Sequence, residues 1–323
     1  MLRSIFTVAF ALGWAAAATA PANAQDVPLA SHIKMATTAG PDVKKIEAWY
    51  TQWLDYKTRE SGKVSADLAK SWGAPKTAGR RYVVMSSDAS PGVFLRAVET
   101  DAVKGYEPLT TWGWNAWEIV VDDIARVNEK IKASPFTIIG GPAALKGYPS
   151  IVAMQVRGPA NEILYLTNET GDHNKSPLPQ PGGLIGRPFI LVVAGPDIAA
   201  LQGWYAETFN MAKGKINDSV VEIISRAQGM PLDTPRPLTL LSMTQRGNIL
   251  ELDGYAGGKG KRPHAAGQLP PGNAMATFSV PKLDAIKATF IAPPAKRDGV
   301  AYAGHRSATV VGPNGEPVEL IEE

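Results

Sequence analysis

The chain has 323 residues, with 33 basic against 30 acidic side chains and no cysteine. The charges alternate without long blocks of one sign, which argues against a nucleic-acid or membrane-surface partner, since those require clustered Lys and Arg. The lack of cysteine excludes disulfides, thiolate metal ligands and cysteine nucleophiles, and the length suffices for two domains with separate cores.

The first 24 residues predict a secretory signal peptide. A positive charge at Arg3 precedes an apolar run from Ile5 to Ala20, and small residues at Ala22 and Ala24 form a cleavage site after Ala24. The apolar run is short for a transmembrane span, so no membrane insertion is expected after cleavage. An exported chain without cysteine indicates a periplasmic or secreted protein.

An internal repeat organises the rest of the chain. Residues 39–50 read AGPDVKKIEAWY and residues 194–205 read AGPDIAALQGWY, with six of twelve positions identical at an offset of 155. Asp42 and Asp197 are placed to cap a helix in each copy, because a carboxylate accepts hydrogen bonds from unpaired amides of the first turn. A domain-sized offset predicts two related domains in tandem.

Each copy divides into two units that read as a strand, a helix and further strands. The expected strands are at 32–38, 82–86, 93–98, 115–121, 136–139, 151–156, 162–166, 238–243, 248–252, 273–280, 307–311 and 318–320, with helices after Asp42, Asp123 and Asp197 and a short one carrying Leu283, Ile286 and Phe290. Between the copies, residues 176–183 hold three prolines and two glycines, which neither a helix nor a central strand tolerates. The predicted organisation is a first domain at 25–172, a linker at 173–186 and a second domain at 187–323.

Four βαβββ units in two pairs resemble the vicinal oxygen chelate superfamily, which includes glyoxalase I, extradiol dioxygenases and bleomycin resistance proteins. The resemblance rests on the Gly-Pro-Asp turn into a helix ending in Trp-Tyr, present twice, and on the closing segment GPNGEPVEL at 312–320. It implies an α+β fold of tandem domains, in which four βαβββ units form two cup-shaped mixed sheets.

The resemblance also implies where a metal would be held. Active members take ligands from the first and last strand of each unit, often His from the first and Glu from the last. In the first domain these positions fall on Lys34 or Met35, Arg96, Ala116 or Trp117, and Tyr165, none of which is a good metal ligand. In the second domain they fall on Phe189 or Ile190, Glu251, Met275 and Glu319.

The second domain therefore keeps the two carboxylates and lacks the histidines. Glu251 and Glu319 could hold a divalent metal, act as general acids or bases, or simply pair with neighbouring Arg or Lys side chains. Tyr165 is the third candidate for catalysis, as a hydrogen-bond donor.

A second constellation suits an anionic ligand. If Lys34, Arg96 and Tyr165 face one cup, they form a cationic pocket for a carboxylate, enolate or phenolate; the alternative is that Lys34 and Arg96 face solvent. Trp114 and Trp117, next to Trp112, form either core or an aromatic platform for a ligand.

Two histidines lie close enough to the expected strands to enter a pocket. His32 is on the first strand, within a register slip of two, and His305 opens a strand of the last unit. The remaining two, His173 and His264, fall in loops and are expected to be solvated.

The predicted function is that of an exported protein acting on a small aromatic, carbonyl-bearing or carboxylate-bearing molecule. One hypothesis is lyase or isomerase chemistry with a degenerate metal site; the alternative is metal-free binding and sequestration, as in bleomycin resistance proteins. Fold alone does not choose between these two functions. The expected partner is a small-molecule ligand, and the chain is expected to be a monomer or a homodimer.

Overall fold

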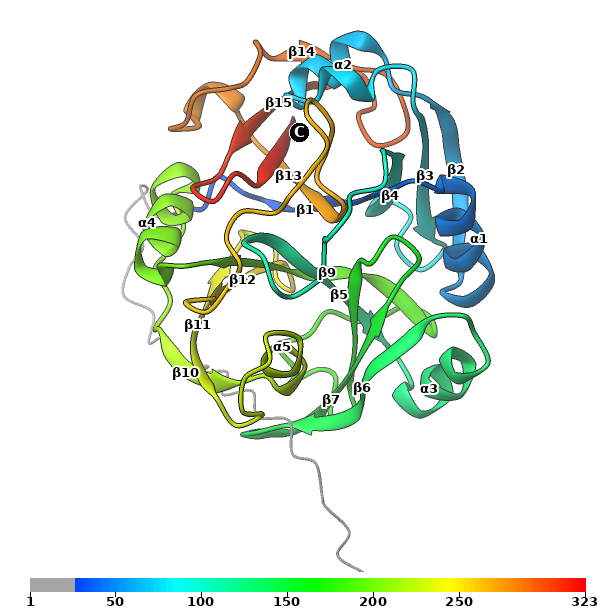
Figure 1. Cartoon of the computed structure of the whole chain (residues 1–323), viewed down its shortest axis with the longest axis vertical. Coiled ribbons are helices and arrows are strands. Elements are labelled where there is room, and N and C mark those ends of the chain that lie inside the picture. The colour runs from blue at the N-terminus through cyan, green and yellow to red at the C-terminus, as the bar shows by residue number, and fades with distance from the viewer. Residues whose placement is uncertain (1–26) are drawn as a thin grey trace, which may run out of the picture.

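A computed structural model describes residues 27–323, so the predicted signal peptide lies outside the described residues and stays a prediction. The described chain forms two eight-stranded mixed sheets with helices along their sides (Figure 1). No helix in this part of the chain is long and apolar enough to cross a membrane.

The chain builds four units in sequence. The first comprises β1 (His32–Gly40), α1 (Val43–Trp53), β2 (Tyr56–Lys63), α2 (Ala66–Ser71), β3 (Arg81–Ser87) and β4 (Phe94–Glu99). The second comprises β5 (Gly113–Val121), α3 (Ile124–Lys132), β6 (Thr137–Leu145), β7 (Tyr148–Arg157) and β8 (Ile163–Glu169). The third comprises β9 (Ile185–Gly195), α4 (Ile198–Phe209), β10 (Asn217–Val220), α5 (Glu222–Ala227), β11 (Pro235–Ser242) and β12 (Ile249–Gly254). The fourth comprises β13 (Gly272–Val280), a 3₁₀ turn (Leu283–Ala285), β14 (Ala295–Lys296), β15 (Arg306–Val311) and β16 (Pro317–Glu322).

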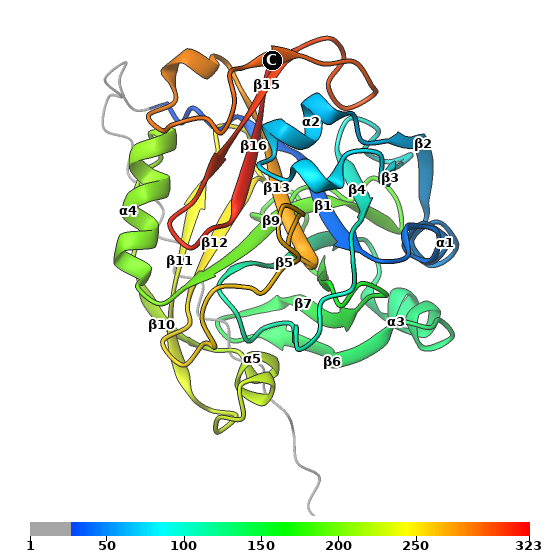
Figure 2. The ribbon, with the colours of Figure 1, turned by 45° about the horizontal axis from the view of Figure 1, so that its top comes forward.

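The predicted α+β fold of four βαβββ units in two mixed sheets is confirmed, but the units pair differently from chain order. Sheet A has the order β10-β11-β12-β9-β5-β8-β7-β6 and joins units two and three; sheet B has the order β14-β15-β16-β13-β1-β4-β3-β2 and joins units one and four (Figure 2). The division expected at residues 173–186 therefore does not separate the sheets, because β8 and β9 on either side of it belong to sheet A. The first strands pair antiparallel, β1 with β13 and β5 with β9, and every unit offers such a strand, so the sequence does not reveal which two units join.

The repeated helix starts are built as expected. The Asp42 carboxylate accepts a hydrogen bond from the Lys45 amide at 3.0 Å, and the Asp197 carboxylate accepts two, from Ala199 and Ala200, both at 3.0 Å. The short helix expected in the fourth unit is wrong, because only the 3₁₀ turn forms there. Its N-cap position is Lys282, which makes no side-chain capping bond, so the first turn is not nucleated.

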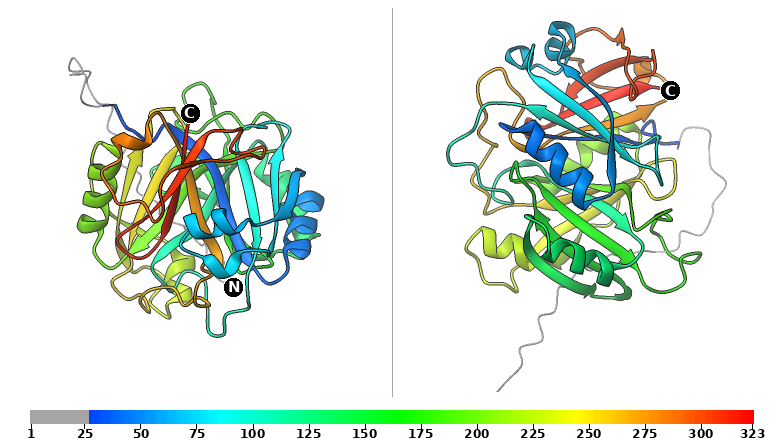
Figure 3. Two further views of the ribbon diagram at one scale, coloured as in Figure 1. Left: turned by 90° about the horizontal axis from the view of Figure 1, so that it is seen from above. Right: turned by 90° about the vertical axis from the view of Figure 1, so that its right-hand side faces the viewer.

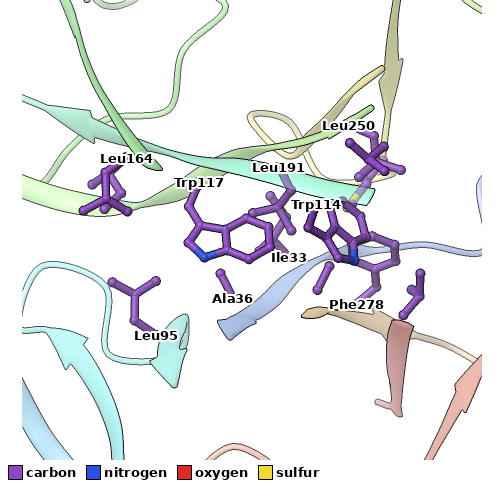
Figure 4. Packing of buried hydrophobic residues seen from close by; sticks show 14 of the residues in the cluster. Ile33, Ala36, Leu95, Trp114, Trp117, Leu164, Leu191, Leu250 and Phe278 are labelled. Carbon is purple, nitrogen blue, oxygen red and sulfur yellow. The ribbon is translucent and has the colours of Figure 1, made fainter. Parts of the chain in front are cut away.

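The two sheets face each other across one apolar core. Figure 4 shows the indoles of Trp114 and Trp117, from β5, between the strands of sheet A and those of sheet B. Their ring centroids are 5.8 Å apart, and both side chains are almost completely buried. Helices α1 and α4 flank this core on opposite sides (Figure 3).

Two buried Tyr–Glu hydrogen bonds connect consecutive units across the sheets. The Tyr50 hydroxyl, on α1, donates to Glu162 at 3.0 Å, and the Tyr205 hydroxyl, on α4, donates to Glu316 at 3.1 Å. The second carboxylate oxygen accepts a backbone amide in each case, from Ala160 at 2.8 Å and from Asn314 at 2.9 Å. The tyrosine of each repeated Trp-Tyr therefore links its own unit, the first or the third, to the turn before the last strand of the next unit.

The two Tyr–Glu hydrogen bonds predict that removing either tyrosine hydroxyl destabilises the protein by a similar amount. Tyr50→Phe and Tyr205→Phe should each lower the free energy of unfolding by about 1 to 3 kcal/mol, because each leaves a buried carboxyl group short of a donor. Urea denaturation followed by tryptophan fluorescence measures the change. Glu207→Gln, an exposed change on α4, is the control and should stay within about 0.5 kcal/mol. Phenylalanine variants as stable as the control would show that these bonds contribute nothing.

Candidate functional site

The outer face of each sheet carries buried polar side chains at the positions where the first and last strands of two units meet. We call these faces cup A, on sheet A, and cup B, on sheet B. Cup A contains Glu118, Tyr165, Glu251 and Asp253; cup B contains Thr37, Arg96, Thr277 and Glu319.

Cup B is occupied by an internal ion pair. The Arg96 guanidinium donates to the Glu319 carboxylate at 2.9 Å, and both side chains are about 2% exposed or less. Arg96 also donates to Thr37 Oγ1 at 3.0 Å and to the Tyr302 hydroxyl at 2.7 Å, and its guanidinium lies 4.4 Å from the centroid of the Trp72 ring. Arg96 is thus held in place on every side.

Glu319 is equally saturated. It accepts hydrogen bonds from Trp72 Nε1 at 2.8 Å, the Tyr302 hydroxyl at 2.7 Å and Thr277 Oγ1 at 2.8 Å, in addition to Arg96. Burial raises the pKa of Glu319, but the guanidinium and these donors outweigh it and hold the pKa below its usual value. Burial likewise opposes the charge of Arg96, and the facing carboxylate raises its pKa. Cup B is therefore a closed structural network with a residual cavity of about 40 Å³.

Cup A holds carboxyl groups without matching cations. Glu118, on β5, is 6% exposed and accepts a hydrogen bond from Thr167 Oγ1 at 2.5 Å. Glu251, on β12, is 2% exposed and makes no hydrogen bond or ion pair to any residue between 27 and 323. Both oxygens of Asp253 and the hydroxyl of Tyr255 are buried and likewise have no partner among the described residues.

Burial is the main cause of the unusual acidities in cup A. It raises the pKa of Glu118 to about 7, and it raises the pKa of Asp253 to about 7 against the opposing field of Arg236. The pKa of Glu251 lies well above its usual range, because burial is reinforced by the charges of Asp253 and Glu118. Burial also keeps the Tyr165 phenol protonated by raising its pKa. Raised pKa values of this kind are typical of groups that transfer protons near neutral pH.

A small enclosed cavity brings three of these groups together. Glu118, Tyr165 and Glu251 line a space of about 20 Å³, closed by apolar side chains such as Phe189 and Leu240. That volume is enough for about one water molecule.

The segment expected to be a domain linker covers this cavity. Pro177 and Leu178 line it, and the backbone carbonyl of Ser176 is held by the Arg246 guanidinium. Beyond the cover is an outer depression of about 600 Å³, and Ile151 and Pro177 line both spaces. A shift of residues 176–178 would therefore join the acid-lined cavity to the surface.

The structure separates several residues that the sequence analysis grouped. Lys34, Arg96 and Tyr165 do not share a pocket, because Arg96 lies in cup B and Tyr165 in cup A. Lys34 forms an ion pair with Glu323 near the chain end and lies 5.9 Å from the Phe94 ring. The proposed cationic pocket is therefore wrong.

The histidines do not enter either cup. His32 Nε2 lies 3.7 Å from Glu323 in the same edge cluster as Lys34, and burial lowers its pKa. His305 is exposed, just before β15.

Trp114 and Trp117 are core residues, and Trp117 Nε1 lies 3.3 Å from Thr38 Oγ1 between the sheets. Trp117 therefore cannot form a ligand platform, because both sheets cover it. Trp114 Nε1 donates to the Pro317 carbonyl at 2.8 Å, which joins β5 to β16.

The residues do not fit the metal suggested for the second domain. Glu251 and Glu319 lie on different sheets, and Glu319 is already occupied by Arg96. Within residues 27–323, no group of three or more His, Asp or Glu side chains could hold a metal ion.

Sequence reasoning missed Glu118 and Asp253. Ala116 and Glu118 lie two residues apart on the same face of β5, and the pairing of β5 with β8 places Glu118, not Ala116, opposite Tyr165. The available signal was a single acid within the apolar strand 114–121.

Comparisons with known proteins identify the fold. No family model and no curated protein matches the sequence. Among solved structures, glyoxalase I from Zea mays has a TM-score of 0.59 at 16% identity, covering 90% of this chain and 92% of that chain. A putative dioxygenase from Bacillus subtilis has a TM-score of 0.58 at 10% identity, covering 91% and 85%. These likenesses show that the chain shares the fold of these two proteins over most of their lengths.

The closed network of cup B predicts a large effect of removing its cation. Arg96→Met should cost about 3 to 5 kcal/mol of unfolding free energy, because Glu319 is left charged and buried. Adding Glu319→Gln should recover at least about 1 kcal/mol, since it removes that charge and keeps an acceptor for Trp72 and Tyr302. Arg59→Met, which breaks an exposed pair with Asp88, is the control and should cost less than about 1 kcal/mol. A single variant as stable as the control would refute the structural role of Arg96.

The raised pKa values in cup A predict that the stability of the folded protein falls as the pH rises. The folded pKa values of about 7 for Glu118 and Asp253 lie above the ordinary values of 4.5 and 3.8. The folded protein therefore binds more protons than the unfolded chain between about pH 4 and 7. This stabilisation is full below that window and is lost as the pH rises through about 7.

Urea midpoints measured from pH 5 to pH 8 should consequently fall. The fall should be smaller in Glu118→Gln, whose amide does not titrate, and unchanged in Glu129→Gln, which is on the exposed face of α3. Equal pH profiles for both variants would contradict the raised pKa of Glu118.

Proposed function

We propose that this protein catalyses proton transfer on a small carbonyl- or carboxylate-bearing molecule in cup A, as an isomerase or lyase. The observation that supports it is the convergence of Glu118, Glu251 and Tyr165 on one buried cavity. Two carboxyl groups with pKa values raised to different extents can serve as a base and an acid at the same pH.

Glu118 is the proposed base. Burial raises the pKa of Glu118 to about 7, so it can exchange a proton near neutral pH, and Thr167 fixes one carboxylate oxygen through the hydrogen bond at 2.5 Å. The free electron pair would take a proton from the carbon next to the substrate carbonyl. The electrons of that C–H bond then form the C=C bond of an enol, and the carbonyl oxygen becomes the acceptor of a proton or hydrogen bond.

Glu251 and Tyr165 are the proposed donors to that oxygen. Burial and the charges of Asp253 and Glu118 raise the pKa of Glu251, which favours its protonated form, and burial raises the pKa of the Tyr165 phenol, so both are proposed to donate. In a cavity closed by apolar side chains, such donors stabilise a developing negative charge more strongly than in water. Return of a proton to the neighbouring carbon gives an isomer, and expulsion of a leaving group gives the product of a lyase.

Substrate entry requires the cover to move. The cavity of about 20 Å³ is smaller than a small organic molecule, so residues 176–178 must shift toward the outer depression. The same cover favours the alternative function, sequestration of a ligand, because a closed lid slows release without any chemistry.

Hydrogen–deuterium exchange tests the proposal without knowledge of the product. The protein is incubated in D₂O with a panel of small keto, hydroxy and aryl carbonyl acids, and loss of the C–H signal is followed by NMR. Glu118→Gln should slow exchange by about 10²- to 10⁴-fold, as expected on loss of a general base. Glu129→Gln serves as the surface control.

Binding of the same compounds, measured in parallel, separates the two functions. Binding without exchange by the wild-type protein would support sequestration and reject catalysis. Exchange that persists in Glu118→Gln would reject Glu118 as the base.

A further inference from the structure

A second pocket lies at the junction of the two sheets, outside both cups. It has a volume of about 190 Å³ and is bordered by the segment connecting β12 to β13 and by the turn before β16. Its walls are mainly apolar and include Trp72, Trp112, Leu269, Pro270, Ile291 and Pro317. We call it the junction pocket.

Exposed apolar side chains gather at its rim. Ile291 is 37% exposed and Val311 is 47% exposed, and both line the pocket. They are two of only six large apolar side chains exposed within residues 27–323. Apolar surface left open beside a cavity indicates a binding site more than a packing defect.

One basic side chain at the rim, Lys261, forms no hydrogen bond or ion pair within the described part of the chain. An isolated parallel β-bridge pairs the backbones of Trp112 and Lys261, and both residues line the pocket. Lys261 makes no ion pair or hydrogen bond with any described residue, whereas nearby Lys259 pairs with Glu107 at 2.8 Å. The Lys261 charge is therefore available to a ligand.

The other charged groups of the pocket are already satisfied. Arg262 donates to the carbonyls of Asn273 at 2.6 Å and Pro271 at 3.3 Å and to Thr111 Oγ1 at 3.2 Å. Glu316 accepts from Tyr205 and Asn314, and burial raises its pKa to about 7, which limits its negative charge. The pocket is consequently positive on balance. Lys261 acts on Glu316 only through its field, which opposes the rise of the Glu316 pKa, and has no hydrogen bond or ion pair within residues 27–323.

The walls are also held rigidly. Trp72 is fixed by its hydrogen bond to Glu319 and by the Arg96 guanidinium over its ring. Trp112 is anchored by its amide, which donates to the Gly260 carbonyl at 2.9 Å. A preformed site of this kind loses little conformational entropy when a ligand binds.

We propose that the junction pocket binds a small aromatic carboxylate, with the ring between the apolar walls and the carboxylate at Lys261. The volume matches this class, since an apolar cavity of about 150 Å³ accepts benzene and a carboxylate adds little. Aromatic walls favour a flat ring, and the free ammonium favours an anion. This site is independent of the proposed chemistry in cup A, because none of the cup A acids lines it.

Benzoate is the probe, with benzamide as its neutral counterpart of the same shape. Binding is followed by NMR through the indole N–H signals of ¹⁵N-labelled full-length mature protein. We expect saturable binding of benzoate at millimolar concentrations, weaker binding of benzamide, and the largest shift at the Trp112 signal, assigned with Trp112→Phe.

Three variants and one control, Lys259→Met, test the geometry. Lys261→Met should weaken benzoate binding about fivefold, as for loss of a solvent-exposed ion pair, while Lys259→Met should leave it unchanged. Trp112→Ala should weaken it about tenfold. Val311→Trp, at an exposed rim position that tolerates a large side chain, should block the pocket without altering the urea midpoint.

The proposal is overturned if benzoate fails to saturate, if benzamide binds equally well, or if Lys261→Met and Lys259→Met behave alike. Loss of benzoate binding in Glu118→Gln or Glu251→Gln, with no effect of Lys261→Met, would place the ligand in cup A instead. Failure of proton exchange in cup A leaves the benzoate result unaffected, so the two proposals fail separately.

Discussion

A buried carboxyl group must find a donor, a cation or a proton, and this requirement shapes every polar site in the molecule. Glu162 and Glu316 are matched by tyrosine hydroxyls and backbone amides, which join the sheets. Glu319 is matched by Arg96. Glu118, Glu251 and Asp253 have no such cation in contact, and burial raises their pKa values instead. The free-energy cost of burying a carboxyl group is thus met in three ways: by hydrogen bonds between the sheets, by the ion pair of cup B, and by the raised pKa values of cup A.

The two cups show how one scaffold acquires opposite chemistry. Arg96 and Glu251 are separated by the repeat offset of 155, and their strand neighbours, Thr37 and Val192, by the same offset. Corresponding positions of the two sheets thus carry a guanidinium in cup B and an acid in cup A. On the facing strand the acid of cup B, Glu319, pairs with Thr277, whereas cup A pairs Tyr165 with Glu118. The two halves of the chain therefore differ in chemistry: the Arg96–Glu319 ion pair fills cup B, whereas cup A contains acids with raised pKa values.

The unit pairing explains why the proline-rich segment belongs to a site. Because units two and three share sheet A, the chain passes from one to the other across the mouth of cup A. Prolines in this stretch remove backbone donors and restrict its conformations, so it can lie over the cavity as a stiff cover. The crossings between sheets occur instead at residues 100–112 and 255–271, and the second crossing borders the junction pocket.

The sequence by itself determined the units, the capped helices after Asp42, Asp123 and Asp197, and the fold class, because these follow from local periodicity, capping and an internal repeat. It also indicated Glu251 and Tyr165, which do line one cavity. Only the tertiary structure decided which units join, since four similar first strands are interchangeable in sequence. It alone separated Glu251 from Glu319, because they lie on different sheets, and it alone revealed Glu118, because the register of β5 against β8 places that residue opposite Tyr165. Helices, strands and caps depend on residues close together in the sequence, whereas the site depends on contacts between residues far apart in the sequence.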